Sequence, residues 1–154
     1  MPTPFTFDRS WVVDVPVERL WAAVADTSRF PEWFPWLDEA DLGPLEEGST
    51  AHFTVNPPLP YKLHLRVDVR RVVPESLVEG EVHGDVAGPA RLEVAAHPAG
   101  STARLVWSLR VCRPMLRGAE RVARPLMLWG HDAVVSRGLD RFSAVLGATI
   151  TTQR

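Results

Sequence analysis

The sequence contains a single cysteine and little net charge, and each of these scarcities excludes a class of protein. Cys112 alone cannot form an internal disulfide or a thiolate cage for a metal, so a reducing, cytoplasmic setting is expected. With a formal net charge of -2 at pH 7, the chain does not have the excess of basic residues that binds nucleic acids or anionic membranes. We therefore expect neither of them as a partner.

Long hydrophobic runs are equally scarce. No stretch is long enough to span a bilayer, and the N-terminus reaches Asp8 and Arg9 without the apolar segment of a secretory signal. The 154 residues, 45% of them hydrophobic, suffice for one domain with a sizeable core. We therefore expect residues 1–154 to form a single domain without an integral membrane segment. The sequence carries no signal for an oligomeric state.

Apolar periodicity divides the chain into a strand, two short helices, a run of further strands and a long helix. Residues 5–14 alternate as a strand with one buried face, and residues 18–25 recur at helical spacing. Ser28 is expected to cap a second short helix containing Pro31, because its hydroxyl can accept an orphan backbone N–H. Residues 37–111 then alternate as successive strands between turn signals, which indicates an antiparallel meander.

Three of the predicted strands are apolar on one face and polar on the other. In the clearest one, Leu63 and Leu65 flank His64. The strands that contain Leu92 and Leu109 repeat this pattern. The sheet is therefore expected to face a core on one side and water on the other.

From about residue 115 to 147 the period becomes helical, and Pro125 is expected to bend this helix because it removes a backbone donor. Such a helix can bury an apolar stripe only against the sheet, so the sheet must curl around it. A curved sheet cannot contact one helix along its whole length, so a gap lined by inward side chains is expected. At about 100° per residue, the stripe includes Met127, His131, Val134, Phe142 and Leu146.

Three local motifs connect this pattern to a known family. They are VPVERLW at 15–21, DTSRFPEW at 26–33 and WGHD at 129–132. With them the chain resembles, over essentially its whole length, the polyketide cyclase/dehydrase and lipid-transport group of the START/Bet v 1-like (SRPBCC) superfamily. The resemblance implies an α+β helix-grip fold, in which a curved antiparallel sheet of about seven strands wraps around the long C-terminal helix. It also implies an elongated cavity that family members use for polyketides, lipids, sterols, quinones or hormone-like molecules.

Candidate ligand-binding residues are apolar or aromatic side chains on the inward strand faces, in the aromatic turn near the second short helix and on the closing helix. Each of them could instead be ordinary core packing, because aromatic and methionine side chains serve both purposes. The candidates are Trp33, Trp36, Phe53, Tyr61, Leu63, Leu65, Leu92, Trp107, Leu109, Met127, His131 and Val134.

His131 is the candidate for catalysis, because it falls near the centre of the apolar stripe. It either completes the core with a hydrogen-bond partner, which the usual pairing of buried polar groups favours slightly, or contacts a ligand and moves protons. No carboxylate pair shares an inward face, and no serine or cysteine has the context of a triad. The other histidines are scattered, so neither a metal site nor a cofactor is predicted.

Three functional hypotheses follow from these residues. The favoured one is a protein that binds or carries an apolar, ring-containing small molecule. The alternative is a polyketide cyclase, aromatase or dehydratase whose cavity folds the substrate while His131 moves protons. A third is an interaction module, co-chaperone-like or quinone-delivering, that uses the fold without catalysis. A second titratable group beside His131 would favour the enzyme.

Overall fold

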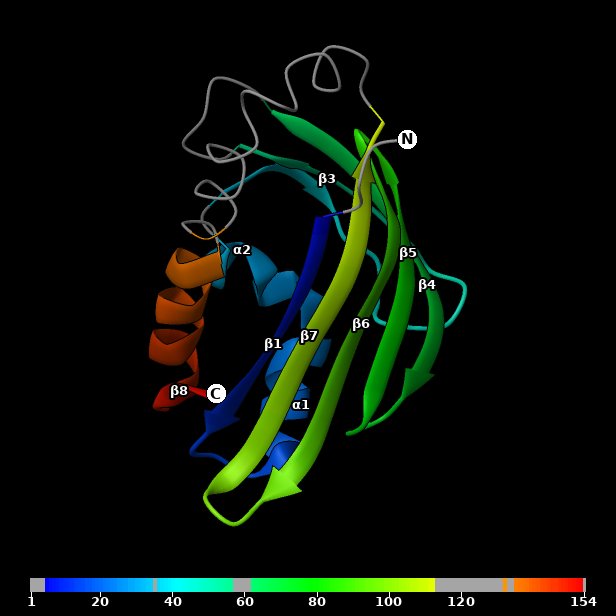
Figure 1. Ribbon diagram of the computed structural model, residues 1–154. Coiled ribbons are helices and arrows are strands. Elements are labelled where there is room, and N and C mark those ends of the chain that lie inside the picture. Colours follow the sequence, from blue (N-terminus) through cyan, green and yellow to red (C-terminus); the bar gives the residue numbers. More distant parts are fainter. Residues whose placement is uncertain (1–4, 35, 57–61, 113–131, 133–134, 154) are drawn as a thin grey trace.

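A computed structural model describes residues 5–34, 36–56, 62–112, 132 and 135–153. These residues form an α+β fold with one curved, eight-stranded antiparallel sheet (Figure 1). The strand order is β2-β3-β4-β5-β6-β7-β1-β8, so the chain meanders from β2 to β7 and β1 then joins beside β7. The predicted fold class and the predicted antiparallel pairing are both confirmed.

The helices and strands follow the predicted order, with one addition. Residue 132 and residues 135–146 are the described part of the C-terminal helix, which ends before Gly147 as expected, while residues 115–131 with Pro125 lie outside the described residues. The addition is an eighth strand after this helix. The elements are β1 (Phe5–Val13), α1 (Val17–Ala25), the 3-10 helix η1 (Thr27–Arg29), α2 (Phe30–Trp33), β2 (Leu37–Asp41), β3 (Thr50–Val55), β4 (Leu63–Val73), β5 (Leu77–Gly84), β6 (Val86–His97), β7 (Gly100–Val111) and β8 (Ile150–Gln153).

The capping role expected of Ser28 is wrong. Ser28 lies inside η1 and donates its hydroxyl hydrogen bond to the Asp26 carboxylate. Arg29 occupies the position before α2 and makes no side-chain cap. The physical reason is that η1 continues directly into α2, which begins at Phe30. The free N–H groups of the first turn of α2 therefore lie one residue further along the chain than a cap at Ser28 requires.

The described core lies between the sheet, α1 and the C-terminal helix. Leu20 of α1 and Phe142 of the C-terminal helix both pack with Val94 of β6. One face of the sheet therefore meets the helices, which lie on the same side of it in Figure 1, and we call this the inner face. The buried members of this core cluster are Val13, Val15, Leu20, Val94, Phe142 and Leu146.

Two side-chain hydrogen bonds fasten the helices at the Val13 end of the sheet. The fully buried Ser101 of β7 donates to the carbonyl oxygen of Val15 at 2.8 Å, which ties β7 to the connection between β1 and α1. Arg19 of α1 donates to the carbonyl oxygen of Leu146 at 2.7 Å and thereby satisfies one orphan carbonyl at the end of the C-terminal helix. Fully packed contacts thus concentrate at this end.

Candidate functional site

A row of side chains crosses the inner face and changes size along its length. The strand register places Phe7 beside Trp107, Trp107 beside Ala90, Ala90 beside Gly80, and Gly80 beside Val69. Residues that pair directly across antiparallel strands point to the same face. Along this row the side chains therefore shrink, from the aromatic rings of Phe7 and Trp107 to the methyl group of Ala90 and the single hydrogen of Gly80. At this small-residue pair, Gly80 and Ala90, the row itself carries little side chain, and the side chain of Val67 on β4 lies 3.2 Å from where a Cβ of Gly80 would be.

The aromatic end of the row is a cluster of stacked rings. Phe7 and Trp107 have ring centroids 4.7 Å apart and planes inclined by 19°. Trp11 follows on the same strand, with its ring centroid 6.4 Å from that of Phe7. Phe7 and Trp11 are buried, whereas Trp107 is only half-buried. Trp107 thus keeps accessible ring surface, held in orientation by Phe7.

Six predicted ligand-binding residues share the inner face. Phe53 of β3 pairs with Leu65 of β4, and Leu92 of β6 pairs with Leu105 of β7. Each of the six is half-buried, in contrast to the buried residues at the Val13 end. The predicted face is confirmed, and a ligand-binding role stays a prediction. The six are Phe53, Leu63, Leu65, Leu92, Trp107 and Leu109.

Two other predicted ligand-binding residues, Trp33 and Trp36, lie outside the strands that carry these six residues. The ring of Trp33 contacts that of Phe142 edge-to-face, with centroids 4.9 Å apart, so it packs α2 against the C-terminal helix. Trp36 directly precedes β2, and its carbonyl oxygen accepts a hydrogen bond from Asn56 at 2.7 Å. Its indole N–H is buried and has no hydrogen-bond partner among the described residues. The remaining candidates, Tyr61, Met127, His131 and Val134, lie outside the described residues.

Arg9 is a residue of this face that the sequence interpretation missed. It pairs with Leu105, and it is the one charged side chain on the inner face of the described strands β1, β6 and β7. Its guanidinium carbon lies 5.4 Å from the centroid of the Phe7 ring, and one nitrogen lies 3.7 Å from a carboxylate oxygen of Asp132. The signal was present, because Arg9 stands at an alternate position between Phe7 and Trp11.

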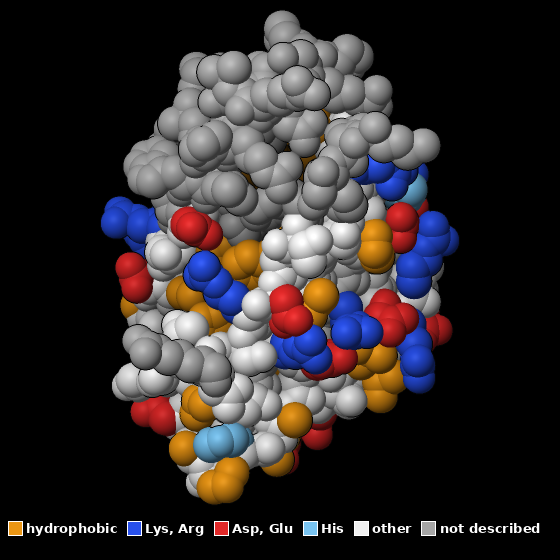
Figure 2. All heavy atoms as spheres, in the orientation of Figure 1, with side chains coloured by type: hydrophobic (Ala, Val, Ile, Leu, Met, Phe, Trp, Pro, Cys, Tyr) orange, Lys and Arg blue, Asp and Glu red, His pale blue; other side chains and the backbone are white. Residues whose placement is uncertain are grey.

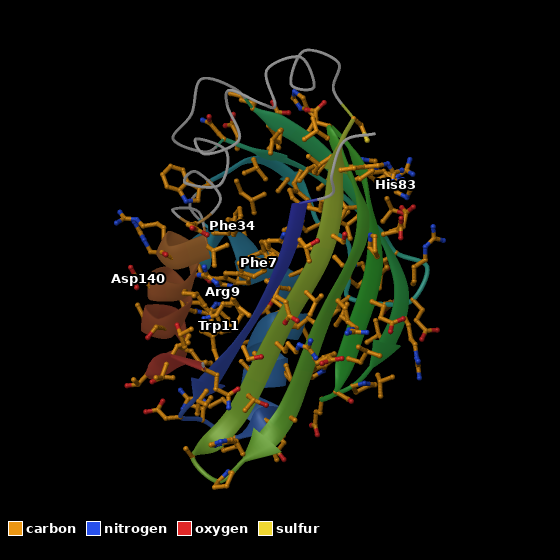
Figure 3. All side chains as sticks on the ribbon, in the orientation of Figure 1. Phe7, Arg9, Trp11, Phe34, His83 and Asp140 are labelled. Atoms are coloured by element: carbon orange, nitrogen blue, oxygen red, sulfur yellow. The ribbon has the colours of Figure 1, made fainter. Side chains whose placement is uncertain are left out.

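Hydrophobic side chains lie around Arg9, with the Asp132 carboxylate at their border (Figure 2). Figure 3 shows the side chains of Phe7, Arg9 and Trp11 between β1 and the C-terminal helix. In the same orientation, Figure 2 shows hydrophobic side chains gathered between these two elements, with a basic side chain among them. Arg9 thus places an exposed cation on the inner face, at the side of β1 that faces the C-terminal helix (Figure 3).

The outer face of the sheet carries ion pairs. Arg104 donates to both carboxylate oxygens of Asp8, at 2.9 and 2.6 Å, and this hydrogen bonding lowers the pKa of Asp8 below its ordinary value. Burial raises the pKa of Asp68, but a hydrogen bond from Thr50 and nearby positive charges, Arg66 foremost, outweigh it, so this pKa is also lowered. These pairs agree with the expected polar face.

Two hollows among the described residues lie away from the aromatic cluster. One of about 430 Å³ is bordered by β2, β3 and β4 and includes His52 and His64. The other, of about 310 Å³, lies between α1, the α2 region and the C-terminal helix, where Arg19 and Trp33 border it. Among the described residues, no three histidine, cysteine or acidic side chains gather as a metal site requires. Nor does any helix of the described ranges have the length and hydropathy to cross a membrane.

Comparison with known proteins agrees with the fold. A conserved protein from Geobacillus kaustophilus matches with a TM-score of 0.71 and 11% identity, covering 96% of this chain and 99% of that one. A Chromobacterium violaceum protein matches with a TM-score of 0.67 and 14% identity, covering 94% and 98%. Identities this low show the fold alone.

The sequence comparison is more specific. No curated protein sequence matches the chain. Residues 4–147, however, match the family model described as polyketide cyclase / dehydrase and lipid transport. This match covers nearly the whole chain, and the curved sheet with its C-terminal helix is the fold that the family resemblance implied. The chain belongs to the polyketide cyclase / dehydrase and lipid transport family.

Proposed function

We propose that the protein binds an apolar, ring-containing small molecule against the inner face of its sheet, over Gly80 and Ala90 and beside Trp107. The observation that carries this proposal is the register row, in which an accessible indole adjoins two of the smallest side chains. Small-molecule sites need a concave, mainly apolar surface. The curvature of the sheet (Figure 1) and the short side chain of Ala90 supply the concavity, and Trp107 supplies a flat surface for stacking.

Two further observations support this proposal. Leu65, Leu92 and Leu109 share the face and keep apolar surface accessible, which a ligand would remove from water. The family description, which joins cyclases to lipid transport, fits a ligand of this class.

Binding without catalysis is the function that the described residues support best. A cyclase or dehydratase, which the family description also includes, needs a group that gives or takes a proton beside the substrate. On the described inner face of β1, β6 and β7 the charged group is Arg9, and arginine stays protonated. Proton transfer by His131, which lies outside the described residues, stays a prediction.

The experiment is a titration with N-phenylnaphthylamine, a neutral two-ring fluorophore, against a variant that fills the small-residue pair. Ala90→Leu places a larger side chain where the ligand is proposed to lie. Affinity should fall by about tenfold or more, while stability to urea changes by less than about 1.5 kcal/mol if the space is empty in the free protein. Trp107→Ala should also weaken binding, because it removes the stacking surface.

The matched control is Ala95→Leu on the same strand. Ala95 pairs with Thr102 on the outer face and is exposed, so the variant should bind the fluorophore like the wild type. If Ala90→Leu binds the fluorophore as tightly as the wild type, or if Ala95→Leu weakens binding equally, the proposed site is wrong.

A further inference from the structure

We propose that the ligand carries an anionic group on its ring system, a carboxylate or phenolate, and that Arg9 binds this group on the inner face of the sheet. This inference rests on the proposed function and names the chemical class of its ligand. It follows from the position of Arg9, from the looseness of its present contacts and from its distance to Trp107.

The position of Arg9 is not explained by packing. Phe7 and Trp11, its neighbours on the same face, are 6% and 5% exposed. An apolar residue opposite Leu105 would continue this surface, whereas a guanidinium beside it must remain hydrated or paired. Arg9 is exposed, so it can be hydrated, and among the described residues Asp132 is the carboxylate that lies near it.

Asp132 is a weak partner for this charge. The nearest distance between the two groups is 3.7 Å, longer than a charge-assisted hydrogen bond, and the side chains are 47% and 57% exposed. Pairs of this kind contribute little to stability. Arg9 makes no side-chain hydrogen bond to the described residues, so its N–H donors can meet a carboxylate in bidentate fashion. The Phe7 ring beneath the guanidinium helps to orient it.

The distance from Arg9 to Trp107 suits a molecule of two or three fused rings. Arg9 pairs with Leu105, and Trp107 lies two residues further along β7, about 7 Å at the usual rise of a strand. The Phe7 ring lies between them, stacked on Trp107 and next to the guanidinium. A ligand that stacks on Trp107 can therefore pass over Leu105, which is half-buried, and end with its anionic group at Arg9.

Two probes with the same rings and different charge test this inference. N-phenylnaphthylamine is neutral, and anilinonaphthalene sulfonate carries a sulfonate that stands in for the ligand's anion. Arg9→Gln should weaken sulfonate binding about 3- to 10-fold and change the affinity for the neutral probe by less than about twofold. Added salt should weaken sulfonate binding to the wild type more than to Arg9→Gln, because salt screens the charge.

Two further variants separate ligand binding from a structural role. Asp132→Asn removes the competing carboxylate, so sulfonate affinity should stay the same or rise. Arg110→Gln removes an equal charge from the outer face of β7 and should leave the affinities for both probes unchanged. If Arg9 only fastens the C-terminal helix, Arg9→Gln and Asp132→Asn will lower the melting temperature alike and shift both probes together, which overturns this inference.

The proposed function and this inference can fail separately. If the wild type binds the neutral probe but Arg9→Gln leaves sulfonate affinity unchanged, only the role of Arg9 is wrong. If the wild type fails to bind the neutral probe, the apolar site itself is wrong and the inference falls with it.

Discussion

The contact between Trp33 and Phe142 is expected to hold α2 against the C-terminal helix, and a double-mutant cycle can measure it. The ring centroids are 4.9 Å apart and the planes are inclined by 67°, which is the edge-to-face geometry that aromatic pairs prefer. Phe142 is 9% exposed, so Phe142→Leu should lower the free energy of unfolding by about 1–2 kcal/mol. Combined with Trp33→Leu, the cycle should give a coupling energy of about 0.5–1.5 kcal/mol.

The assay is urea unfolding followed by far-ultraviolet circular dichroism, because replacing a tryptophan alters the fluorescence. The control is the affinity of both single variants for N-phenylnaphthylamine, which should stay near the wild-type value if Trp33 is an anchor. A coupling energy below about 0.3 kcal/mol would refute the anchoring role. A loss of probe binding by Trp33→Leu at unchanged stability would assign Trp33 to the ligand site instead.

Two other predictions concern the hairpin at Gly100 and the acid limb of stability. Gly100→Ala should lower the free energy of unfolding by more than about 2 kcal/mol, because its φ is +138° and an added Cβ would lie 2.4 Å from the Val13 carbonyl oxygen. Gly48 has φ +85° and open space where a Cβ would lie, so Gly48→Ala should lower the free energy of unfolding by only about 1 kcal/mol. Thermal unfolding compares the two variants, and equal losses of stability in Gly100→Ala and Gly48→Ala would contradict the argument. Arg104 lowers the pKa of Asp8, so this pair stabilises the fold above the unfolded pKa of the carboxyl and ceases to do so as pH falls through the folded one. When the pH is lowered from neutral to below about pH 4, Asp8→Asn should therefore lose less stability than the wild type does. If the urea midpoints of the variant and the wild type fall in parallel over this range, the prediction is wrong.

Local patterns predict most of the fold because period and chain order are local properties. The alternation from Phe5 to Val13 and the helical spacing from Val17 to Ala25 are visible without any partner. The strand β8 escapes this approach, since it has four residues and is defined by its pairing with β1 at the opposite end of the chain. Short strands carry too few residues for a periodic signal, although Ile150 and Thr151 are β-branched.

The candidate site is predictable in part for the same reason. The alternation of side chains along a strand is enough to place Leu65 and Trp107 on an inward face, and the strand register confirms that face. The pairing of Trp107 with Ala90, and of Ala90 with Gly80, depends on the register of three strands, which no local pattern contains. Arg9 occupies a position where the alternation of the first strand calls for an apolar side chain, but a charged residue this close to the N-terminus is easily taken for a solvent-exposed one.

The most direct test of the account is a titration of the isotope-labelled protein with N-phenylnaphthylamine, followed by amide chemical shifts. The account predicts that the largest shifts occur at Gly80, Ala90 and Trp107, together with the Trp107 indole N–H. Shifts confined to the outer face, around Arg66 and Asp68, would contradict it, as would a spectrum that the ligand leaves unchanged.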